Sequence, residues 1–221
     1  GEPQSWMKGA ESKQMWLQNA GFIWVPFIAV CAVAAWFLMD DLAASRASFS
    51  EQVVIFRSKH TWIMCWLYLG TFGSFIGYSA GFPLLSKSQF PQVNALAYAW
   101  LGPLIGALIR PLGGWLSDKL GGAQVSFWNF IAMTAGVAGV LAFLPQAGTG
   151  GNFYGFLAMF MALFMSAGIG NGSTFRMIPA IFLEERRREA AGKGRAAGEQ
   201  AVRDANTEAA AALGFASAVG A

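Results

Sequence analysis

Arg110 lies within an apolar stretch, a setting in which an arginine side chain needs a chemical reason. It is part of the run Gly-Ala-Leu-Ile-Arg-Pro-Leu-Gly-Gly (106–114), and no acidic residue follows it before Asp118. Placing a cation at the middle of a bilayer costs about 2.5–3.5 kcal/mol, so such a charge is kept mainly where it faces a wet cavity, a counter-ion or a substrate. An anionic substrate is one interpretation. The other is an arginine near the membrane surface whose charged end reaches the headgroups.

A second polar patch lies in a later apolar stretch. The run Ala-Gly-Ile-Gly-Asn-Gly-Ser-Thr-Phe-Arg-Met-Ile-Pro (167–179) contains three alternating glycines, and Asn171, Ser173 and Thr174 supply neutral hydrogen-bond donors. The glycines predict a weakened helix with accessible backbone. Such a patch can approach an anion without placing a second full charge beside it.

A glycine-rich motif lies at the end of the stretch that contains Arg110 and in the short loop that follows. It has the sequence Gly-Gly-Trp-Leu-Ser-Asp-Lys-Leu-Gly-Gly (113–122), and glycine allows a tight turn at the membrane surface. Asp118 can accept hydrogen bonds from a helix N-terminus or pair with a cation. A generic acidic cap on a short loop is the simpler alternative. For Arg176, snorkelling to the headgroups or pairing with Asp118 is favoured over substrate contact.

The composition is that of a membrane protein. Of the 221 residues, 55% are hydrophobic and 12% are charged, whereas a soluble domain carries roughly 25% charged residues. The only histidine is His60, and Cys31 and Cys65 both lie in apolar stretches, so neither a histidine metal cluster nor a disulfide framework is expected. The net charge of +3 is modest and falls beside membrane spans. We therefore expect the lipid bilayer as surroundings, with no metal, no cofactor and no nucleic acid.

Five stretches are long enough to cross a bilayer as helices. They are residues 20–39, 61–85, 93–116, 125–144 and 153–183. A sixth run begins near Thr207 and continues to Ala221, and residues 1–18 have neither a basic start nor a signal peptide. We expect a fragment cut at both ends.

The distribution of Lys and Arg predicts the orientation. The gaps 40–60, 117–124 and 184–206 together carry ten basic residues, and the gaps on the other side carry three. Because basic loops stay in the cytoplasm, we expect those three gaps there. Arg110 and Arg176 are the two basic residues left within the membrane.

Glycines recur at helical spacing around Arg110. Gly102, Gly106, Arg110 and Gly114 are four apart, and small residues at this spacing let helices pack closely. Helix packing explains the glycines by itself. It also implies that Arg110 points into the bundle and not toward lipid.

The two motifs together resemble those of the major facilitator superfamily. The motif 113–122 is similar to the loop motif between the second and third helices of each half in that superfamily, and the run 167–179 resembles the glycine-rich motif of its nitrate/nitrite porters. The resemblance implies an all-α, polytopic membrane helix bundle of that fold, truncated. Residues 1–39 would be an external loop and the last helix of the N-terminal bundle, 40–60 the cytoplasmic central loop, and 61–221 a C-terminal six-helix bundle truncated in its fifth helix.

The function that the resemblance implies is secondary transport of nitrate, nitrite or both across the bacterial inner membrane, with the anion held between two bundles. Exchange by alternating access is favoured because no Asp or Glu falls within the second to fifth stretches. Proton-coupled nitrate symport is the alternative. A passive channel and a membrane-embedded enzyme are further alternatives. An enzyme needs His, Asp or Glu in catalytic spacing at the membrane surface, so we expect no enzymatic activity.

The resemblance also implies the site. Arg110 corresponds to the substrate arginine, and Tyr68 and Phe72 lie one turn apart on the first helix of the C-terminal half. Nitrate is planar like guanidinium, so Arg110 can donate two in-plane hydrogen bonds, Tyr68 a third, and Phe72 can cover the face of the ion. The partner arginine would lie in the N-terminal bundle.

The remaining expected site residues fall into two groups. Those expected to bind substrate are Gly170, Asn171, Gly172 and Ser173. Those expected to have gating or structural roles are Gly114, Asp118, Gly121 and Arg176.

Overall fold

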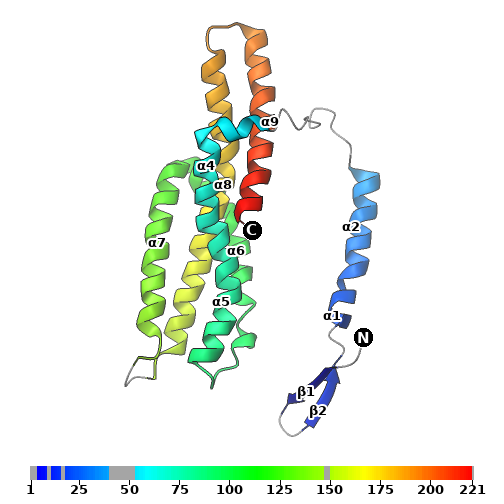
Figure 1. Cartoon of the computed structure of the whole chain (residues 1–221), viewed down its shortest axis with the longest axis vertical. Helices are drawn as coiled ribbons and strands as arrows, with labels where there is room; N and C mark the ends of the chain where they lie inside the picture. The colour runs from blue at the N-terminus through cyan, green and yellow to red at the C-terminus, as the bar shows by residue number, and fades with distance from the viewer. Residues whose placement is uncertain (1–3, 9–10, 16–17, 40–52, 147–149, 221) are drawn as a thin grey trace. The chain divides into compact units, whose positions relative to one another are not determined.

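The chain divides into two compact units, Gly1–Arg46 and Ala47–Ala221, each described here by itself. The computed structural model (Figure 1) describes residues 4–8, 11–15, 18–39, 53–146 and 150–220.

The first unit begins with a short antiparallel hairpin. Strands β1 (Gln4–Lys8) and β2 (Glu11–Met15) pair with Gln4 opposite Met15 and Lys8 opposite Glu11. We predicted a loop here, because two five-residue strands of mostly polar residues carry almost no alternation of apolar and polar positions. The apolar helices α1 (Gln18–Phe22) and α2 (Trp24–Leu38) follow, and the predicted span 20–39 corresponds to them.

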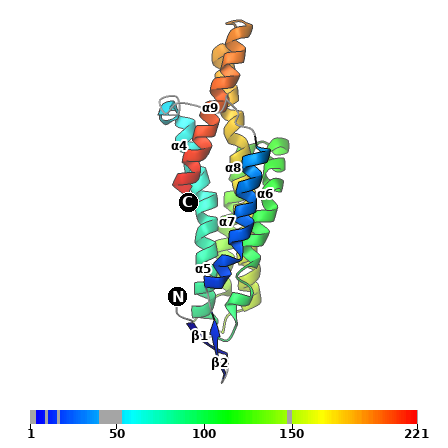
Figure 2. The ribbon, with the colours of Figure 1, turned by 90° about the vertical axis from the view of Figure 1, so that its right-hand side faces the viewer.

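The second unit is a helical bundle, and Figures 1 and 2 show its helices lying alongside one another. A short 3₁₀ helix, η2 (Val54–Arg57), leads into a long helical segment with a π-helical turn at its middle. That segment comprises α4 (Lys59–Tyr68), the π turn η3 (Leu69–Gly73) and α5 (Ser74–Gln89). The later elements are η4 (Ala95–Ala97), α6 (Leu101–Leu120), α7 (Gly122–Phe143), α8 (Phe153–Ala190) and α9 (Arg195–Gly220).

Three helical segments of the described residues are long and apolar enough to cross a membrane. They are Ala95–Leu120, Gly122–Phe143 and Phe153–Ala190. Three of the five predicted spans are thereby confirmed. The predicted loop at 117–124 is shorter than expected, because α6 ends at Leu120 and α7 begins at Gly122. Gly121 alone separates them with a φ of +88°, a conformation in which a Cβ would be strained.

The long helix α8 is the centre of the bundle and packs against α6, α7 and α9. Toward one end of the bundle its neighbours form an aromatic core that includes Phe82, Phe156, Phe160 and Phe164. Toward the other end a stripe of small residues on α9, from Ala205 to Ala216, packs against α4 and α8. Small side chains let two helices approach closely, so α8 and α9 form a hairpin that extends beyond the other helices (Figure 1).

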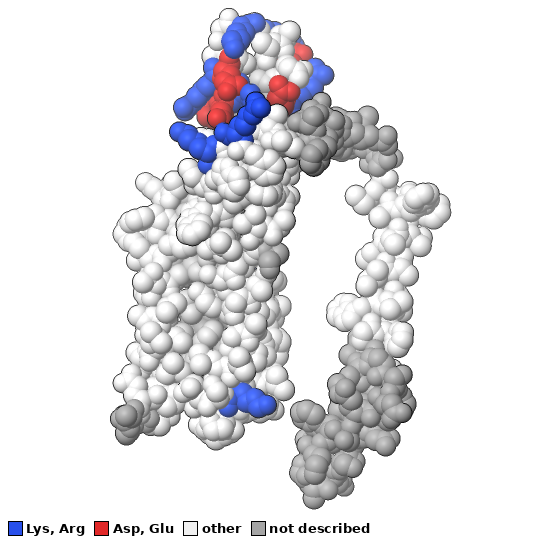
Figure 3. All heavy atoms as spheres, in the orientation of Figure 1, with Lys and Arg blue, Asp and Glu red and all other residues white. Residues whose placement is uncertain are grey.

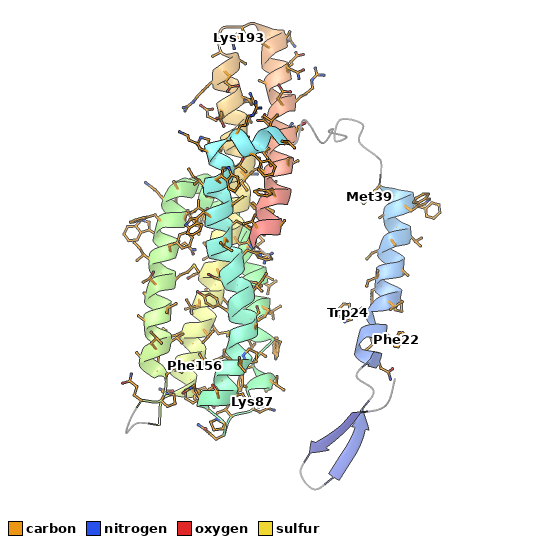
Figure 4. The ribbon with its side chains drawn as sticks, in the orientation of Figure 1. Phe22, Trp24, Met39, Lys87, Phe156 and Lys193 are labelled. Carbon is orange, nitrogen blue, oxygen red and sulfur yellow. The ribbon has the colours of Figure 1, made fainter. Side chains whose placement is uncertain are left out.

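Charged side chains gather on that hairpin. In Figure 3 the acidic and basic atoms of the second unit lie mostly on the extended α8–α9 end, and Figure 4 places Lys193 there and Lys87 at the opposite end. The surface between these ends is nearly free of charge in the same view (Figure 3), as a lipid-facing surface must be.

Candidate anion-binding site

A groove of about 500 Å³ lies between α6 and α8, and it contains the arginine singled out from the sequence. From α6 come Arg110, its helical neighbours Ala107 and Pro111, and Gly114. The residues that line the groove from α8 are Asn171, Gly172, Phe175 and Arg176. Five of the predicted site residues therefore share one cavity.

Glycines determine how closely the walls of this groove approach each other. A Cβ at Gly172 would overlap the carbonyl oxygen of Arg110, and one at Gly113 would overlap the carbonyl oxygen of Ile169. The two backbones are thus in direct contact beside Arg110. At Gly114 a Cβ would lie 3.7 Å from the carbonyl oxygen of Gly172, an ordinary van der Waals distance. The tight contact falls on Gly113 and not on Gly114, which the stripe of four-residue spacing had included.

Arg110 is half-buried, and none of the carboxylates that the structure describes pairs with it. Its Nε atom is buried without a hydrogen-bond partner, and among the described residues its guanidinium takes part in no ion pair. Its Cζ atom lies 5.4 Å from the ring centroid of Phe72 and 5.2 Å from that of Phe75. Aromatic faces attract a cation without neutralising it, so the positive charge remains available to an anion.

Tyr68 and Phe72 lie beside the groove and do not line it. Their rings stack with centroids 5.1 Å apart, and Tyr68 also contacts Phe175 with centroids 5.1 Å apart. The two predicted aromatic residues are therefore linked to the groove through Arg110 and Phe175.

The glycine-rich run of α8 presents its polar groups to different neighbours. Asn171 is 2% exposed, and its Nδ2 atom has no hydrogen-bond partner although the residue lines the groove. Ser173 is fully buried, also without a partner, but does not line the groove. A Cβ at Gly170 would meet Asn129 and Thr71, so this glycine faces α7 and η3.

The predicted weakening of the helix at this run was wrong. Helix α8 continues without a break from Phe153 to Ala190. The glycines are at contacts with α6 and α7, and packing of this kind supports helical backbone that the intrinsic propensity of glycine would disfavour.

Arg176 lies in the groove and pairs with Asp118. The Arg176 Nε atom donates a hydrogen bond to Asp118 Oδ1 over 2.7 Å. The Arg176 side chain is 63% exposed and that of Asp118 is 50% exposed. Pairing with Asp118 was one of the two roles expected for Arg176 from the sequence, and snorkelling to the headgroups was the other. Asp118 and Gly121 lie at the end of α6 and do not line the groove.

Two aromatic residues at this site were not singled out from the sequence. Phe75 lies under the Arg110 guanidinium, and Phe175 lines the groove between Asn171 and Arg176. Each is three or four residues beyond a residue that was singled out, Phe72 and Asn171. Helical spacing was the available signal, and ordinary packing aromatics carry the same signal.

Comparison with known proteins gives consistent matches. Residues 12–199 match the family model of the Major Facilitator Superfamily. The chain is 51% identical to the nitrate/nitrite transporter NarU of Escherichia coli over 213 residues, which are 96% of this chain and 46% of that protein. It is 42% identical over 187 residues to the probable nitrate/nitrite antiporter NarK2 of Thermus thermophilus, covering 82% of this chain and 42% of that protein. The NarU protein of Salmonella typhimurium is 50% identical over 205 residues, which are 93% of this chain and 44% of that protein. The chain thus spans about half the length of these relatives.

Proposed function

Because the chain belongs to the major facilitator superfamily, we propose that it forms part of a secondary transporter that moves nitrate, nitrite or both across the inner membrane by alternating access. In this proposal α2 is the last helix of an N-terminal bundle, and α4 to α9 supply the first five helices of the C-terminal bundle. The anion lies between the bundles, so the N-terminal bundle is a necessary partner. The names of the relatives, which are nitrate/nitrite transporters and a probable antiporter, support this substrate class.

The observation that carries the proposal is the Arg110 guanidinium, which lies in a groove whose described lining contains no carboxylate. Nearby, the Asn171 amide is a second buried donor without a partner. Buried polar groups are nearly always hydrogen-bonded, so two unsatisfied donors in one groove favour a ligand that only accepts hydrogen bonds. An inorganic oxyanion is such a ligand.

The charge and shape of the site favour a planar anion with a single charge. One guanidinium supplies one positive charge and two parallel N–H groups, which match two oxygens of nitrate in a plane. Sulfate would bring a second negative charge and a tetrahedral shape into the same space. Tyr68 and Phe72 lie beside the groove and belong to the proposed site through their contacts with Phe175 and Arg110. Gly170 faces α7 and η3, Ser173 is buried outside the groove, and the part of both in binding stays a prediction.

Exchange of nitrate for nitrite is the proposed mode of transport, and proton-coupled symport is the alternative. No Asp or Glu falls within the spans 61–85, 93–116, 125–144 and 153–183, so those helices offer no carboxylate as a proton carrier. We propose a transporter and not an enzyme because the described lining of the groove offers positive charge and hydrogen-bond donors but no general base.

Counterflow tests this proposal. The complete transporter, reconstituted in vesicles loaded with nitrite, is expected to take up labelled nitrate faster than in unloaded vesicles, and excess sulfate is expected to leave the rate unchanged. A channel would show no acceleration. A symporter would take up nitrate when only an inward proton gradient is imposed. Strong inhibition by sulfate together with none by nitrite would contradict the choice of anion.

A further inference from the structure

Phe75 contacts the Arg110 guanidinium but lies outside the residues that line the groove. The Phe75 ring is nearly parallel to that of Phe72, with an interplanar angle of 6° and centroids 6.2 Å apart. The Arg110 Cζ atom lies 5.2 Å from the Phe75 centroid, slightly nearer than the 5.4 Å that separates it from Phe72. The guanidinium therefore lies over a pair of aligned aromatic faces.

The position of the Phe75 ring is determined by α6 and α8. Phe75 packs edge-on against Phe164, which is 1% exposed, with centroids 5.6 Å apart and an interplanar angle of 86°. On α6, a Cβ at Gly106 would lie 2.5 Å from Phe75 Cε2, so the ring occupies the space that the glycine leaves. Gly106 is one helical turn before Arg110. Helix α6 thus provides both the glycine against which the Phe75 ring packs and the cation that lies over that ring.

This arrangement has a chemical consequence for Arg110. A partly buried guanidinium that is not paired with a carboxylate needs some electrostatic compensation, and an aromatic face supplies it without a formal negative charge. A carboxylate in that place would compete with an incoming anion for the same N–H groups. Two rings leave those groups free while restricting the orientation of the guanidinium plane.

We propose that Phe75 is a positioning residue for Arg110, which holds the guanidinium in the orientation that binds the anion without touching the anion itself. This proposal rests on the proposed function, in which Arg110 binds nitrate. The loss of one desolvated cation–π contact corresponds to about 1–2 kcal/mol, or roughly a 5- to 30-fold change in affinity.

Nitrate affinity, measured by isothermal titration calorimetry on the complete purified transporter, tests the proposal. Phe75→Leu is expected to raise the Kd for nitrate about 5- to 30-fold, and Phe75→Tyr, which keeps the ring, is expected to restore it to within about twofold of the parent. Phe160→Leu is the matched control. Phe160 belongs to the same aromatic core, but its ring packs against Tyr78, Phe82 and Phe156 and not against Arg110. It is expected to leave the Kd within about twofold of the parent.

A fluorination series keeps the test decisive even if Phe75→Leu folds poorly. Replacing Phe75 with difluoro- and trifluorophenylalanine weakens the negative face of the ring and changes its shape little, so the Kd is expected to rise with each step. The same series at position 160 is expected to give a constant Kd. A flat series at position 75 would overturn the proposal.

A double-mutant cycle separates this inference from the function on which it rests. If Phe75 acts through Arg110, Phe75→Leu adds less than about twofold to the Kd of Arg110→Lys. An equal loss in both backgrounds would show that Phe75 acts on binding by another route and would overturn the positioning role alone. If Arg110→Lys itself binds nitrate as tightly as the parent, the proposed function fails, and this inference fails with it.

Discussion

A guanidinium held between helices needs stabilisation, and within the described part of the chain Arg110 receives it from ring faces and not from a carboxylate. The nearest acidic partner along the chain, Asp118, is paired with Arg176 instead. Arg110 and Arg176 therefore differ in kind. The Arg110 guanidinium is free to pair with an anionic ligand. The Arg176 guanidinium pairs with the exposed Asp118 carboxylate, an interaction that contributes little to stability.

The first prediction follows from this difference. Arg110→Lys keeps the charge but loses the planar fork, so the binding free energy for nitrate is expected to fall by about 2–5 kcal/mol. Tyr68→Phe removes one neutral donor and is expected to cost about 0.5–1.5 kcal/mol. Arg176→Lys is expected to have little effect.

Calorimetric titration of the complete transporter with nitrate measures this order, with unfolding midpoints recorded to check folding. If Arg110→Lys binds like the parent and Arg176→Lys does not, the substrate arginine has been assigned to the wrong helix.

At the scale of helices, the contact between α6 and α8 follows from helical geometry. Each step of four residues turns about 40° beyond a full turn, so a stripe at that spacing drifts around the helix. Measured about the axis of α6 from the direction of Gly102, Gly106 is rotated by about 40° and Gly113 by about 20°. Arg110 and Gly114 are rotated further, by about 80° and about 120°. Gly102, Gly106 and Gly113 face α8 or its side chains. Arg110 lies at the edge of this contact, where the groove opens.

The second prediction concerns this helix contact. Gly172→Ala places a methyl group where the carbonyl oxygen of Arg110 lies, so α6 and α8 must separate, and the expected cost is about 1–3 kcal/mol of stability. Gly114→Ala is the matched control on the facing helix. Its Cβ would meet the nearest atom at 3.7 Å, and a change within about 0.5 kcal/mol is expected.

Thermal unfolding of both variants in the same detergent provides the measurement. Equal midpoints for Gly172→Ala and the parent would show that the close approach of the two backbones is unimportant for stability.

At the scale of the whole second unit, charge is concentrated at one end. The α8–α9 hairpin carries Lys193, and Lys87 lies at the opposite end (Figure 4). Within the hairpin, Arg186 bonds both oxygens of Glu208, which is 8% exposed, and donates to Glu189 over 2.7 Å. The hydrogen bond to Glu208 raises the pKa of Arg186 above its ordinary value, because it stabilises the charged guanidinium.

The third prediction tests the orientation of the helices. A cysteine at position 193 is expected to react with a membrane-impermeant maleimide only from the cytoplasmic side, and one at position 87 only from the opposite side. Both are introduced after Cys31 and Cys65 have been replaced by serine. Labelling of intact cells and of inverted vesicles measures the sidedness, and a reversed pattern would contradict the orientation expected from Lys and Arg.

The fourth prediction concerns the ion pair that joins α8 to α9. Glu208→Gln leaves the partly buried Arg186 guanidinium without its main acceptor, so a loss of about 1–3 kcal/mol of stability is expected. Glu199→Gln is the control, because its pair with Arg195 is exposed (92% and 58% for the Arg and Glu side chains) and such pairs contribute about 0–1 kcal/mol. Unfolding midpoints compare the two, and an equal effect would mean that burial adds nothing to the Arg186 pair.

Much of the fold could be predicted because span length and loop charge are properties of the linear chain. A run of about 20 apolar residues has to be helical in a bilayer, since its backbone groups have no other partners, and three of the predicted spans are confirmed. The hairpin β1–β2 and the single-residue turn at Gly121 were not predicted, because the first lacks a hydrophobic pattern and the second depends on one dihedral angle.

The sequence by itself determined that an intramembrane arginine is present and that no carboxylate lies near it in its own helix. Only the tertiary structure decided that Phe72 and Phe75 lie beneath its guanidinium, that Asn171 shares its groove and that Gly113 makes the tight contact. The reason is geometric. Which side chains meet depends on the angle and the rotation at which two helices pack, and these are decided jointly by residues that lie far apart in the chain.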